Sequence, residues 1–530
     1  MRRKYLFLIT ISLFFAACNS DSLKKEKITP RDFSVTKANS YNDLFIDSSE
    51  VQNYIQKNTL PDSIAMRMIS FYNGRNYEYA WFSSNGLTEQ TKAFSSLLNL
   101  SGDTSSQQEK LKETIRDLMA SDDISISTSN KKIQGIELML TENLIRYSLD
   151  TYESGLVVRK EIERFIPIKK VDAMQLADSI LHMQHKRKTD FADVNKPYDE
   201  LLKQLDLFVK IAKDNKWKVV DSNDKKFNKK LSPSQIVVLK NHLFLLKNLP
   251  QEDTTFLMNE TFTEGIKNFQ TTMGLTPDGK IDSKLWEMLQ VNPLARIQQI
   301  LVNMDRMRWM PLSTEGNLIV VNTPEFVLRM FDGKKEVFSM PVVVGKEGHN
   351  TTLFSDYLNT IVFSPYWNVP PSIVKSEILP GMAKNPNYLA AHDMETTGET
   401  GGLPNVRQKP GPTNSLGKVK FLFPNSFNIY FHDTPAKSLF EKDVRTFSHG
   451  CIRLQNPEEL ANYLLRNDSK WTPEKIKEAM NSGKETFVKI EKPIPVFITY
   501  YTAWVDANGK LNFREDIYGH DKEIIKKMFF

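Results

Sequence analysis

The chain has 530 residues, of which 40% are hydrophobic and 25% are charged, and it contains two cysteines, Cys18 and Cys451. This length predicts about three or four structural units, and two cysteines exclude a fold held by several disulfides or by four-cysteine zinc sites. The 70 Lys and Arg residues exceed the 64 Asp and Glu residues by only 6 and form no long basic tract, so nucleic acid is not an expected partner.

The first residues have the pattern of an export signal. Three basic residues, 2–4, precede a largely apolar stretch, 6–17, that is too short to span a bilayer as a mature helix. Two alanines stand directly before Cys18, which resembles a bacterial lipoprotein signal and would make Cys18 the lipid-modified N-terminus. An ordinary secretory signal is the alternative. We expect a signal peptide at 1–18, a tether at 19–40, and a body exported to the periplasm and anchored to a membrane by lipid.

Residues 41–228 are patterned mainly for helices. Between Ile136 and Tyr147, apolar residues recur at intervals of three and four, as on one face of an amphipathic helix. Because no catalytic motif stands out in this region, we expect a helical scaffold domain.

Residues 229–292 predict a compact unit of three helices. Apolar residues at helical spacing occupy 236–246 and 262–273, and Asp282 can cap a third helix. The segment 265–286 resembles the small peptidoglycan-binding domain, because its Phe-Gln, Gly-Leu and Asp-Gly elements follow in that family's order. A helical hairpin without a ligand is the alternative.

Residues 295–488 show the alternating pattern of β-strands. An Asp-Gly pair at 332–333 predicts a hairpin. The stretch 372–416 is rich in proline and glycine, and such a long connection in a β domain is usually a lid or an insertion.

The last part of the chain, 489–530, is expected to form a β-hairpin that packs on the rest. Its predicted strands are 496–505 and 510–514, with a type I′ turn at the Asn-Gly pair 508–509. Together these patterns predict a multidomain α+β protein, with a helical scaffold, a three-helix module and a mainly β domain that carries an insertion.

Candidate catalytic residues lie at the end of one predicted strand, 428–432. Alternation along this strand directs Tyr430 and His432 to the same face. Cys451 follows in the sequence Ser-His-Gly-Cys, and an exported thiol without a disulfide partner suggests a catalytic thiolate. A neighbouring imidazolium would stabilise that thiolate, and on sequence alone either His432 or His449 could provide it.

The motifs His-Asp-Thr at 432–434 and Ser-His-Gly-Cys-Ile-Arg at 448–453 resemble the signature of the L,D-transpeptidases, cysteine acyltransferases with a YkuD-like catalytic fold. Other segments resemble the large YcbB-like members, which combine a scaffold domain, a peptidoglycan-binding module and a catalytic domain with a capping insertion. These segments are 303–309, 324–326, 365–370, 411–417 and 504–506.

The resemblance implies that Cys451 is the nucleophile and that His432 is the general base and later the acid. His449 then has either a direct catalytic role or a structural one in the turn. Ser448 either orients an imidazole or shapes that turn. Gly450 permits a sharp bend and an approach by substrate, and N–H groups of the turn are candidate oxyanion donors.

Five further residues receive supporting roles. Tyr430 either adds a hydroxyl to the oxyanion site or is a packed aromatic residue. Asp433 either fixes the strand end or hydrogen-bonds the histidine. Arg453 either pairs with a substrate carboxylate or forms a structural ion pair. Trp367 and Asn414, in the segments shared with the large members, are expected to contact substrate.

The implied reaction is the formation of 3→3 peptidoglycan cross-links through a thioester, with release of D-alanine. An L,D-carboxypeptidase and an enzyme that attaches proteins to peptidoglycan are alternatives at the same site. The expected partners are peptidoglycan stem peptides and glycan, together with a membrane through the N-terminal lipid. No cofactor and no metal is expected.

Three rival interpretations differ in chemistry. His432, His449 and Cys451 could be zinc ligands, although two of them are only two residues apart. A papain-like peptidase would place its cysteine before its histidine, the reverse of the order found here. A non-catalytic lipoprotein that anchors the wall to the membrane would have no use for an intact thiol and histidine.

Overall fold

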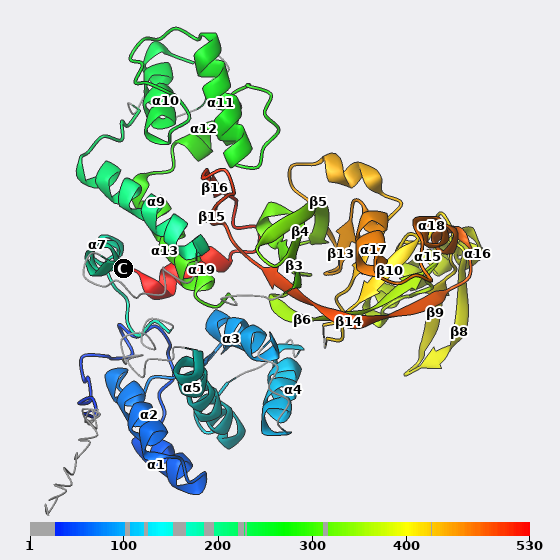
Figure 1. Cartoon of the computed structure of the whole chain (residues 1–530), viewed down its shortest axis with the longest axis horizontal. Helices are drawn as coiled ribbons and strands as arrows, with labels where there is room; N and C mark the ends of the chain where they lie inside the picture. Colours follow the sequence, from blue (N-terminus) through cyan, green and yellow to red (C-terminus); the bar gives the residue numbers. More distant parts are fainter. Residues whose placement is uncertain are drawn as a thin grey trace, which may run out of the picture.

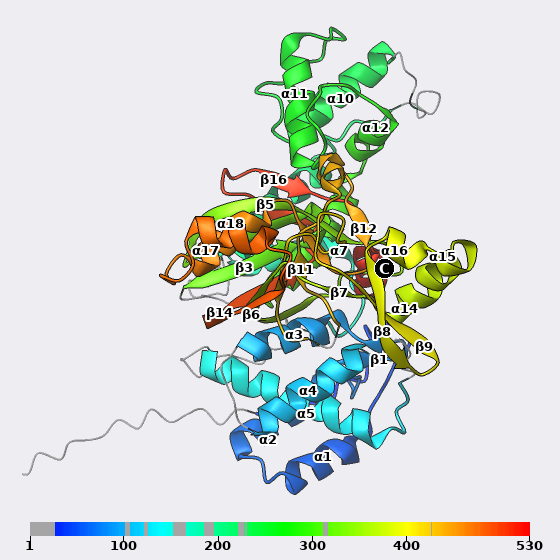
Figure 2. The same cartoon turned by 90° about the vertical axis from the view of Figure 1, so that its right-hand side faces the viewer.

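The computed structural model describes residues 27–100, 106–120, 126–151, 166–184, 196–220, 227, 231–310, 316–425 and 427–530. The expected signal peptide and Cys18 lie outside these residues. A helical region and a small three-helix module stand at opposite ends of the molecule, with a mainly β domain between them (Figures 1 and 2). Within the described residues, no helix is both long and apolar enough to cross a membrane.

The N-terminal helices pack around one core. They are α1 (Ser48–Lys57), α2 (Asp62–Gly74), α3 (Glu89–Leu100), α4 (Ser106–Ala120) and α5 (Lys131–Thr151), and a short hairpin of β1 (Phe82–Ser83) and β2 (Gly86–Leu87) lies among them. The helix expected through Ile136 and Tyr147 is α5, which buries Leu140 and Leu144 completely. The helical nature of this region is therefore confirmed.

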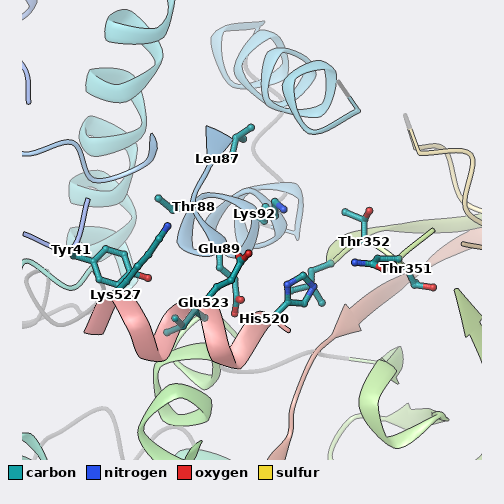
Figure 3. A pocket seen from close by; sticks show the side chains of 13 residues that line it. Tyr41, Leu87, Thr88, Glu89, Lys92, Thr351, Thr352, His520, Glu523 and Lys527 are labelled. Carbon is teal, nitrogen blue, oxygen red and sulfur yellow. The ribbon is translucent and has the colours of Figure 1, made fainter. Parts of the chain in front are cut away.

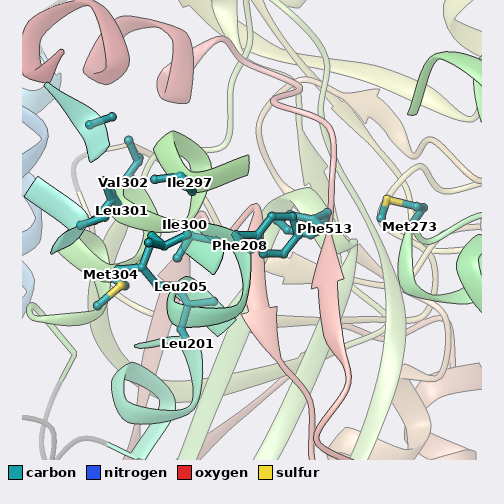
Figure 4. Close-up of a cluster of buried hydrophobic side chains, with 14 of the residues drawn as sticks. Leu201, Leu205, Phe208, Met273, Ile297, Ile300, Leu301, Val302, Met304 and Phe513 are labelled. Atoms are coloured by element: carbon teal, nitrogen blue, oxygen red, sulfur yellow. The ribbon is translucent and has the colours of Figure 1, made fainter. Parts of the chain in front are cut away.

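A second core joins parts of the chain that are distant in sequence. It contains α7 (Ala173–Gln184), α9 (Lys196–Lys213), α13 (Pro293–Met307) and α19 (His520–Met528). Figure 4 shows Leu205 and Phe208 of α9 beside Ile300 of α13 and Phe513. The last helices of the expected scaffold thus share their core with the three-helix module and the C-terminus.

A buried arginine links three elements at this junction. Arg306 of α13 pairs with Glu89 of α3, with Nε 2.5 Å from Oε1, and also with Asp521 of α19. Breaking a buried ion pair by removing one partner typically costs about 3–5 kcal/mol. The pair therefore fixes α3 and α19 relative to α13.

The three-helix module consists of α10 (Pro233–Leu245), α11 (Glu260–Thr272) and α12 (Ser283–Leu289). Ser232 and Gln235 form a capping box at the start of α10, and the Asp282 side chain accepts a hydrogen bond from Leu285 N at the start of α12. Thr276 of this module donates a hydrogen bond of 2.9 Å to Asp443 of the β domain. The module is therefore docked against the β domain.

The β domain is a closed barrel. Its strands are β3 (Asn317–Asn322), β4 (Val327–Asp332), β5 (Lys335–Gly345), β6 (Phe354–Phe363), β10 (Val419–Leu422), β11 (Phe431–His432), β12 (Thr446–Ser448), β13 (Ile452–Leu454) and β14 (Thr486–Thr499). The sheet order is β12-β5-β13-β11-β10-β6-β14-β3-β4, and an additional pairing of β4 with β5 closes the ring. Asp332 pairs with Lys335 across Gly333, so the expected hairpin is confirmed. Helices α17 (Pro457–Leu465) and α18 (Pro473–Asn481) contribute side chains to the barrel's core.

The expected insertion folds as a small unit with its own core. It contains β7 (Trp367–Asn368), α14 (Pro371–Ile373), the π-helix η3 (Val374–Ile378), α15 (Leu379–Lys384), α16 (Tyr388–Ala391), β8 (Met394–Thr400) and β9 (Leu403–Gln408). The three strands form a separate sheet in the order β7-β9-β8. Buried residues of this unit, including Ile373, Ile378 and Val406, pack together. We refer to residues 367–408 as the cap.

The expected C-terminal hairpin differs from the structure. Residues 496–499 belong to β14, which pairs with β6 and runs parallel to β3, because a strand that is buried on both faces lies inside a sheet. The hairpin contains only β15 (Ala503–Val505) and β16 (Leu511–Phe513). Val505 pairs with Leu511, so five residues connect the strands and the expected type I′ turn is wrong. Helix α19 follows and buries Ile524 and Met528.

Candidate active site

The candidate cysteine lies in a tight turn between β12 and β13. Gly450 has a φ of +111°, a conformation that side-chain-bearing residues rarely adopt. Ser448 Oγ donates to the Cys451 carbonyl at 2.5 Å and accepts a hydrogen bond from Gly450 N at 3.1 Å. Ser448 therefore shapes the turn and does not orient an imidazole. The Gly450 N–H is already bonded, which leaves the N–H groups of His449 and Cys451 as candidate oxyanion donors.

A neighbouring loop supports this turn from behind. Thr351 Oγ1 donates to the Gly450 carbonyl at 2.9 Å and accepts a hydrogen bond from Gly345 N at 3.0 Å. A Cβ atom on Gly345 would lie 1.9 Å from the carbonyl oxygen of His349, so only glycine fits there. Sequence reasoning missed Thr351, because no local motif indicates a contact between residues that are 99 positions apart.

His432 is buried on β11 in a defined tautomer. Its Nδ1 lies 2.5 Å from the Asp433 carbonyl oxygen. Because a carbonyl only accepts hydrogen bonds, Nδ1 carries the proton, and in the neutral ring Nε2 keeps its lone pair. His432 stands in register with Arg453 of β13 and Lys420 of β10. Burial, and secondly the charge of Arg453, lower the pKa of His432 to about 3, so the ring is neutral near pH 7.

The Cys451 thiol is half-buried and donates to the Asn428 carbonyl at 3.4 Å. Burial raises the pKa of Cys451 to about 11, while hydrogen bonding to Tyr430 and the charge of Arg453 act in the opposite direction. In the described part of the chain, the thiol forms no hydrogen bond with His432. Such bonds in free enzymes are often long and tighten with substrate.

The expected thiolate and imidazolium pair is therefore not the resting state of this site. A low-polarity environment disfavours the charged form of both groups, and two nearby cations, Arg453 and Lys420, further disfavour a protonated His432. The site instead holds a neutral thiol and a neutral imidazole. Any proton transfer between them must accompany the chemical step.

We expect the alkylation of Cys451 to report this raised pKa. The rate with iodoacetamide should rise with pH and level off well above the reference thiol value of about 8.5, because only the thiolate reacts. The measurement is the alkylation rate across the pH range, followed by mass spectrometry. Tyr430→Phe should move the inflection higher, since hydrogen bonding to Tyr430 lowers the pKa of the thiol. An inflection below the reference value would contradict the neutral pair.

His449 contacts the cap and not the thiol. Its Nε2 lies 3.3 Å from Glu377 Oε1 on the π-helix η3, and its ring centroid lies 5.0 Å from that of His349. π-helical turns are rare and are frequent at functional sites. This geometry favours a structural role for His449, in which it connects the Cys451 turn to the cap.

We expect His449→Gln to keep kcat within about fivefold. Burial lowers the pKa of His449, so its partly exposed contact with Glu377 contributes no more than a surface ion pair would, about 0–1 kcal/mol. Glu377→Gln should change the kinetics to a similar extent, and the double variant should add little to either single change. Steady-state kinetics of the three variants provide the measurement. A fall in kcat of about 100-fold or more in His449→Gln alone would instead assign His449 a direct role.

Tyr430 and Asp433 occupy the positions expected for them. The ring centroids of Tyr430 and His432 are 5.8 Å apart, and burial raises the pKa of Tyr430, which keeps its hydroxyl protonated. The Asp433 carboxylate accepts hydrogen bonds from Lys418 N at 2.9 Å and Lys437 Nζ at 2.8 Å. Asp433 thus fixes the strand end with its side chain and holds the imidazole with its main-chain carbonyl.

The three expected substrate-binding residues differ in their environments. Arg453 is half-buried, has a buried Nε without a hydrogen-bond partner and forms no ion pair with an acidic residue in the described part of the chain. Trp367 is half-buried beside the core of the cap. Asn414 is completely buried, its Nδ2 donates to the carbonyls of Pro365 and Lys409, and its Oδ1 accepts from a backbone N–H. The expected substrate contact of Asn414 is therefore wrong, because its amide is used to hold the base of the cap.

Among the residues that the structure describes, no group of three or more His, Cys, Asp or Glu side chains is arranged to hold a metal ion.

Two family matches cover much of the chain. Residues 316–489 match the L,D-transpeptidase catalytic domain called YkuD, and residues 67–205 match a scaffold domain. A "Putative L,D-transpeptidase" of Haemophilus influenzae is 32% identical over 243 residues, which cover 43% of this chain and 49% of that protein. The chain thus matches about half the length of this curated relative.

Two solved structures are similar to parts of the chain. An L,D-transpeptidase of Stackebrandtia nassauensis is 13% identical, with a TM-score of 0.22, and the match covers 52% of this chain and 95% of that one. An L,D-transpeptidase of Xylanimonas cellulosilytica is 12% identical, with a TM-score of 0.17, and the match covers 52% of this chain and 97% of that one.

The fold and the site define a β-barrel domain with a cysteine and a histidine on adjoining segments beside a cap. With the family matches, they show that residues 316–489 form a catalytic domain of the L,D-transpeptidase family. The chain joins a YkuD-type catalytic domain to a scaffold domain, as in the YcbB-like members.

Proposed function

We propose that the protein is a murein L,D-transpeptidase that forms 3→3 cross-links through a thioester on Cys451. The observation that carries this proposal is the parallel pairing of β11 with β13, because His432 and the strand that follows Cys451 are then neighbours. The Nε2 lone pair of His432 makes it a base for the thiol. A nucleophile next to a positioned base is the arrangement that acyl transfer requires.

The first half-reaction transfers the stem peptide to the enzyme. His432 Nε2 takes the thiol proton as Sγ attacks the carbonyl carbon of the third residue of a stem tetrapeptide. The N–H groups of His449 and Cys451 stabilise the oxyanion. The imidazolium then gives its proton to the departing amine of D-alanine, which leaves a thioester on Cys451 and a neutral His432.

The second half-reaction releases the product. His432 accepts a proton from the amine of a second stem peptide as that amine attacks the thioester carbonyl. The sulfur leaves and regains the proton from His432, and a new amide bond joins the two stems. Water in place of the amine would make the site a carboxypeptidase, and an amine on a protein would make it a protein-attaching enzyme.

The proposed substrate contacts use residues near the thiol. Arg453 binds a carboxylate of the stem peptide, because its half-buried guanidinium has no acidic partner in the described part of the chain. Trp367 offers an aromatic surface at the base of the cap.

We further propose that residues 229–292 bind peptidoglycan and that Cys18 carries a lipid which anchors the body in the periplasm. The docked three-helix module supports the first proposal, and the sequence before Cys18 supports the second. Mass spectrometry of the mature N-terminus would test the anchor. A lipid adduct on Cys18 is expected, and cleavage at another residue would contradict it.

The reaction is tested with the full chain and a disaccharide-tetrapeptide substrate. We expect mass spectrometry to detect dimers that have lost one D-alanine and whose fragments show a 3→3 link. Tripeptide monomers alone would instead identify a carboxypeptidase. Unchanged tetrapeptide would contradict acyl transfer on this substrate.

A further inference from the structure

A cavity of about 200 Å³ lies next to the loop that supports the Cys451 turn (Figure 3). It is enclosed by the start of α3, residues 350–353 of the β domain, and α19. Its lining includes the charged or polar residues Glu89, Lys92, Thr351, His520, Glu523 and Lys527. The cavity therefore has walls from the scaffold, the barrel and the C-terminal helix, while Cys451 is not among the residues that line it.

Two opposite charges, those of Lys92 and Glu523, face this cavity. In the described part of the chain, neither the Lys92 ammonium nor the Glu523 carboxylate forms a hydrogen bond or a close ion pair, although Lys92 interacts electrostatically with Glu89 and with Glu523. Lys92 is half-buried, and burial lowers its pKa, which is the cost of removing an ammonium group from water. Glu523 lies on the exposed side of the cavity. A ligand carboxylate in contact with the Lys92 ammonium would supply the direct partner that this group lacks.

The other charged groups of the cavity contact residues other than Lys92 and Glu523, so these two side chains remain available to a ligand. Glu89 is held by Arg306, with Oε1 2.5 Å from Nε. The Lys527 ammonium lies over the ring of Tyr41, 5.8 Å from its centroid. The imidazole of His520 packs edge-to-face against Tyr500 and Tyr518, and burial lowers its pKa. The positive charge of Lys92 thus lies inside the cavity, and the negative charge of Glu523 lies at its edge.

We propose that this cavity binds a small zwitterion, an amino acid or a dipeptide with a free carboxylate and a free ammonium group. The ligand carboxylate pairs with Lys92 and the ligand ammonium pairs with Glu523. Both pairs replace lost hydration with a charge-assisted hydrogen bond. The volume is below the roughly 300–1,000 Å³ of sites for drug-sized ligands, which limits the ligand to this size.

Binding in this cavity would be coupled to the cysteine turn. Thr351 lines the cavity and donates through Oγ1 to the Gly450 carbonyl at 2.9 Å. A ligand that shifts the loop at 350–353 therefore acts on the residue that precedes Cys451. We infer that occupancy of the cavity changes the reactivity of the Cys451 thiol.

Calorimetry on the full chain tests the binding site. The protein carries Cys451→Ala to prevent covalent chemistry, and the probes are D-alanine, L-alanine, propionate and ethylamine. At least one alanine enantiomer should bind with a Kd of about 10 mM or lower, while propionate and ethylamine should each bind at least about tenfold more weakly. Absence of binding by both alanines, or equal binding by propionate, would overturn the proposal.

Variants locate the bound probe. Lys92→Met and Glu523→Gln should each weaken alanine binding by about tenfold or more, because each removes one charged contact. Lys110→Met and Glu113→Gln change exposed residues of α4 in the same way and should leave binding unchanged. Equal affinity in all four variants would place the alanine elsewhere, for example at the thiol site. Melting curves establish whether each variant is folded.

The coupling between the cavity and the Cys451 turn is measured by the alkylation rate of Cys451 in the wild-type protein. Saturating alanine should change the rate of Cys451 alkylation by about fivefold or more, the usual range for coupled sites, and Lys92→Met should abolish that change. An unchanged rate in the wild-type protein would overturn the coupling. Neither measurement requires turnover of peptidoglycan, so a failure here is distinct from a failure of the proposed reaction.

Discussion

Replacing Cys451 with alanine is expected to abolish thioester formation and D-alanine release from a stem tetrapeptide. The proposed chemistry passes through a bond to Sγ, and no other cysteine is present in the chain except Cys18. We expect a loss of more than about 10⁴-fold in kcat/KM, as is typical when a nucleophile is removed. Intact-protein mass spectrometry with substrate, together with an assay of released D-alanine, provides the measurement.

The Cys451→Ala variant is expected to fold, because of the position of Cys451 in the structure. Cys451 is half-buried, and its thiol hydrogen-bonds only the Asn428 carbonyl and Tyr430 among the described residues, so its removal should change the melting temperature little. Cys451→Ser keeps a hydroxyl at the same position and is the matched control for shape. A folded Cys451→Ala protein that still releases D-alanine would refute the proposed nucleophile.

Replacing His432 with glutamine is expected to lower kcat/KM by about 10² to 10⁴-fold, the usual contribution of a general base. The glutamine amide can still donate to the Asp433 carbonyl, as Nδ1 of the imidazole does, but it cannot accept and return a proton. Alkylation of Cys451 at high pH should persist in this variant, because the thiolate then forms without a base. Single-turnover kinetics and alkylation rates are the two measurements.

The pH dependence of the wild-type protein provides a control for this variant. Since burial and Arg453 lower the pKa of His432 to about 3, the base stays neutral as the pH falls through 6.5, the usual histidine value. The acidic limb of kcat/KM should therefore lie well below that value. A limb near 6.5 that is lost in His432→Gln would show that His432 titrates normally, and an unchanged rate in His432→Gln would exclude it as the base.

Local patterns in the sequence predicted much of the fold. The helical period between Ile136 and Tyr147 predicts α5, and Asp282 is the N-cap of α12 as its position predicts. Alternation directed Tyr430 and His432 toward the same face. These features follow from the geometry of a single helix or strand, which a short stretch of sequence determines.

These local patterns do not predict which strands pair when they are far apart in the sequence. The hydrophobic pattern of residues 496–499 is equally compatible with a hairpin strand. In the structure, however, these residues complete β14 inside the barrel. The proline- and glycine-rich pattern of 372–416 predicts an insertion, but it does not predict the sheet that this insertion forms with β7 or the core of its own. Which strand a segment joins depends on partners that are far away in the chain.

The same division holds at the candidate site. Local motifs are enough to identify the cysteine, the histidine, the glycine of the turn and the resemblance to the L,D-transpeptidases. The folded chain is needed to see that Asn414 holds the cap, that Thr351 supports the turn, and that the thiol and the imidazole are both neutral. The physical reason is that residue types follow from the sequence, whereas burial and the distance to cations such as Lys420 and Arg453 arise only when separate strands are brought together.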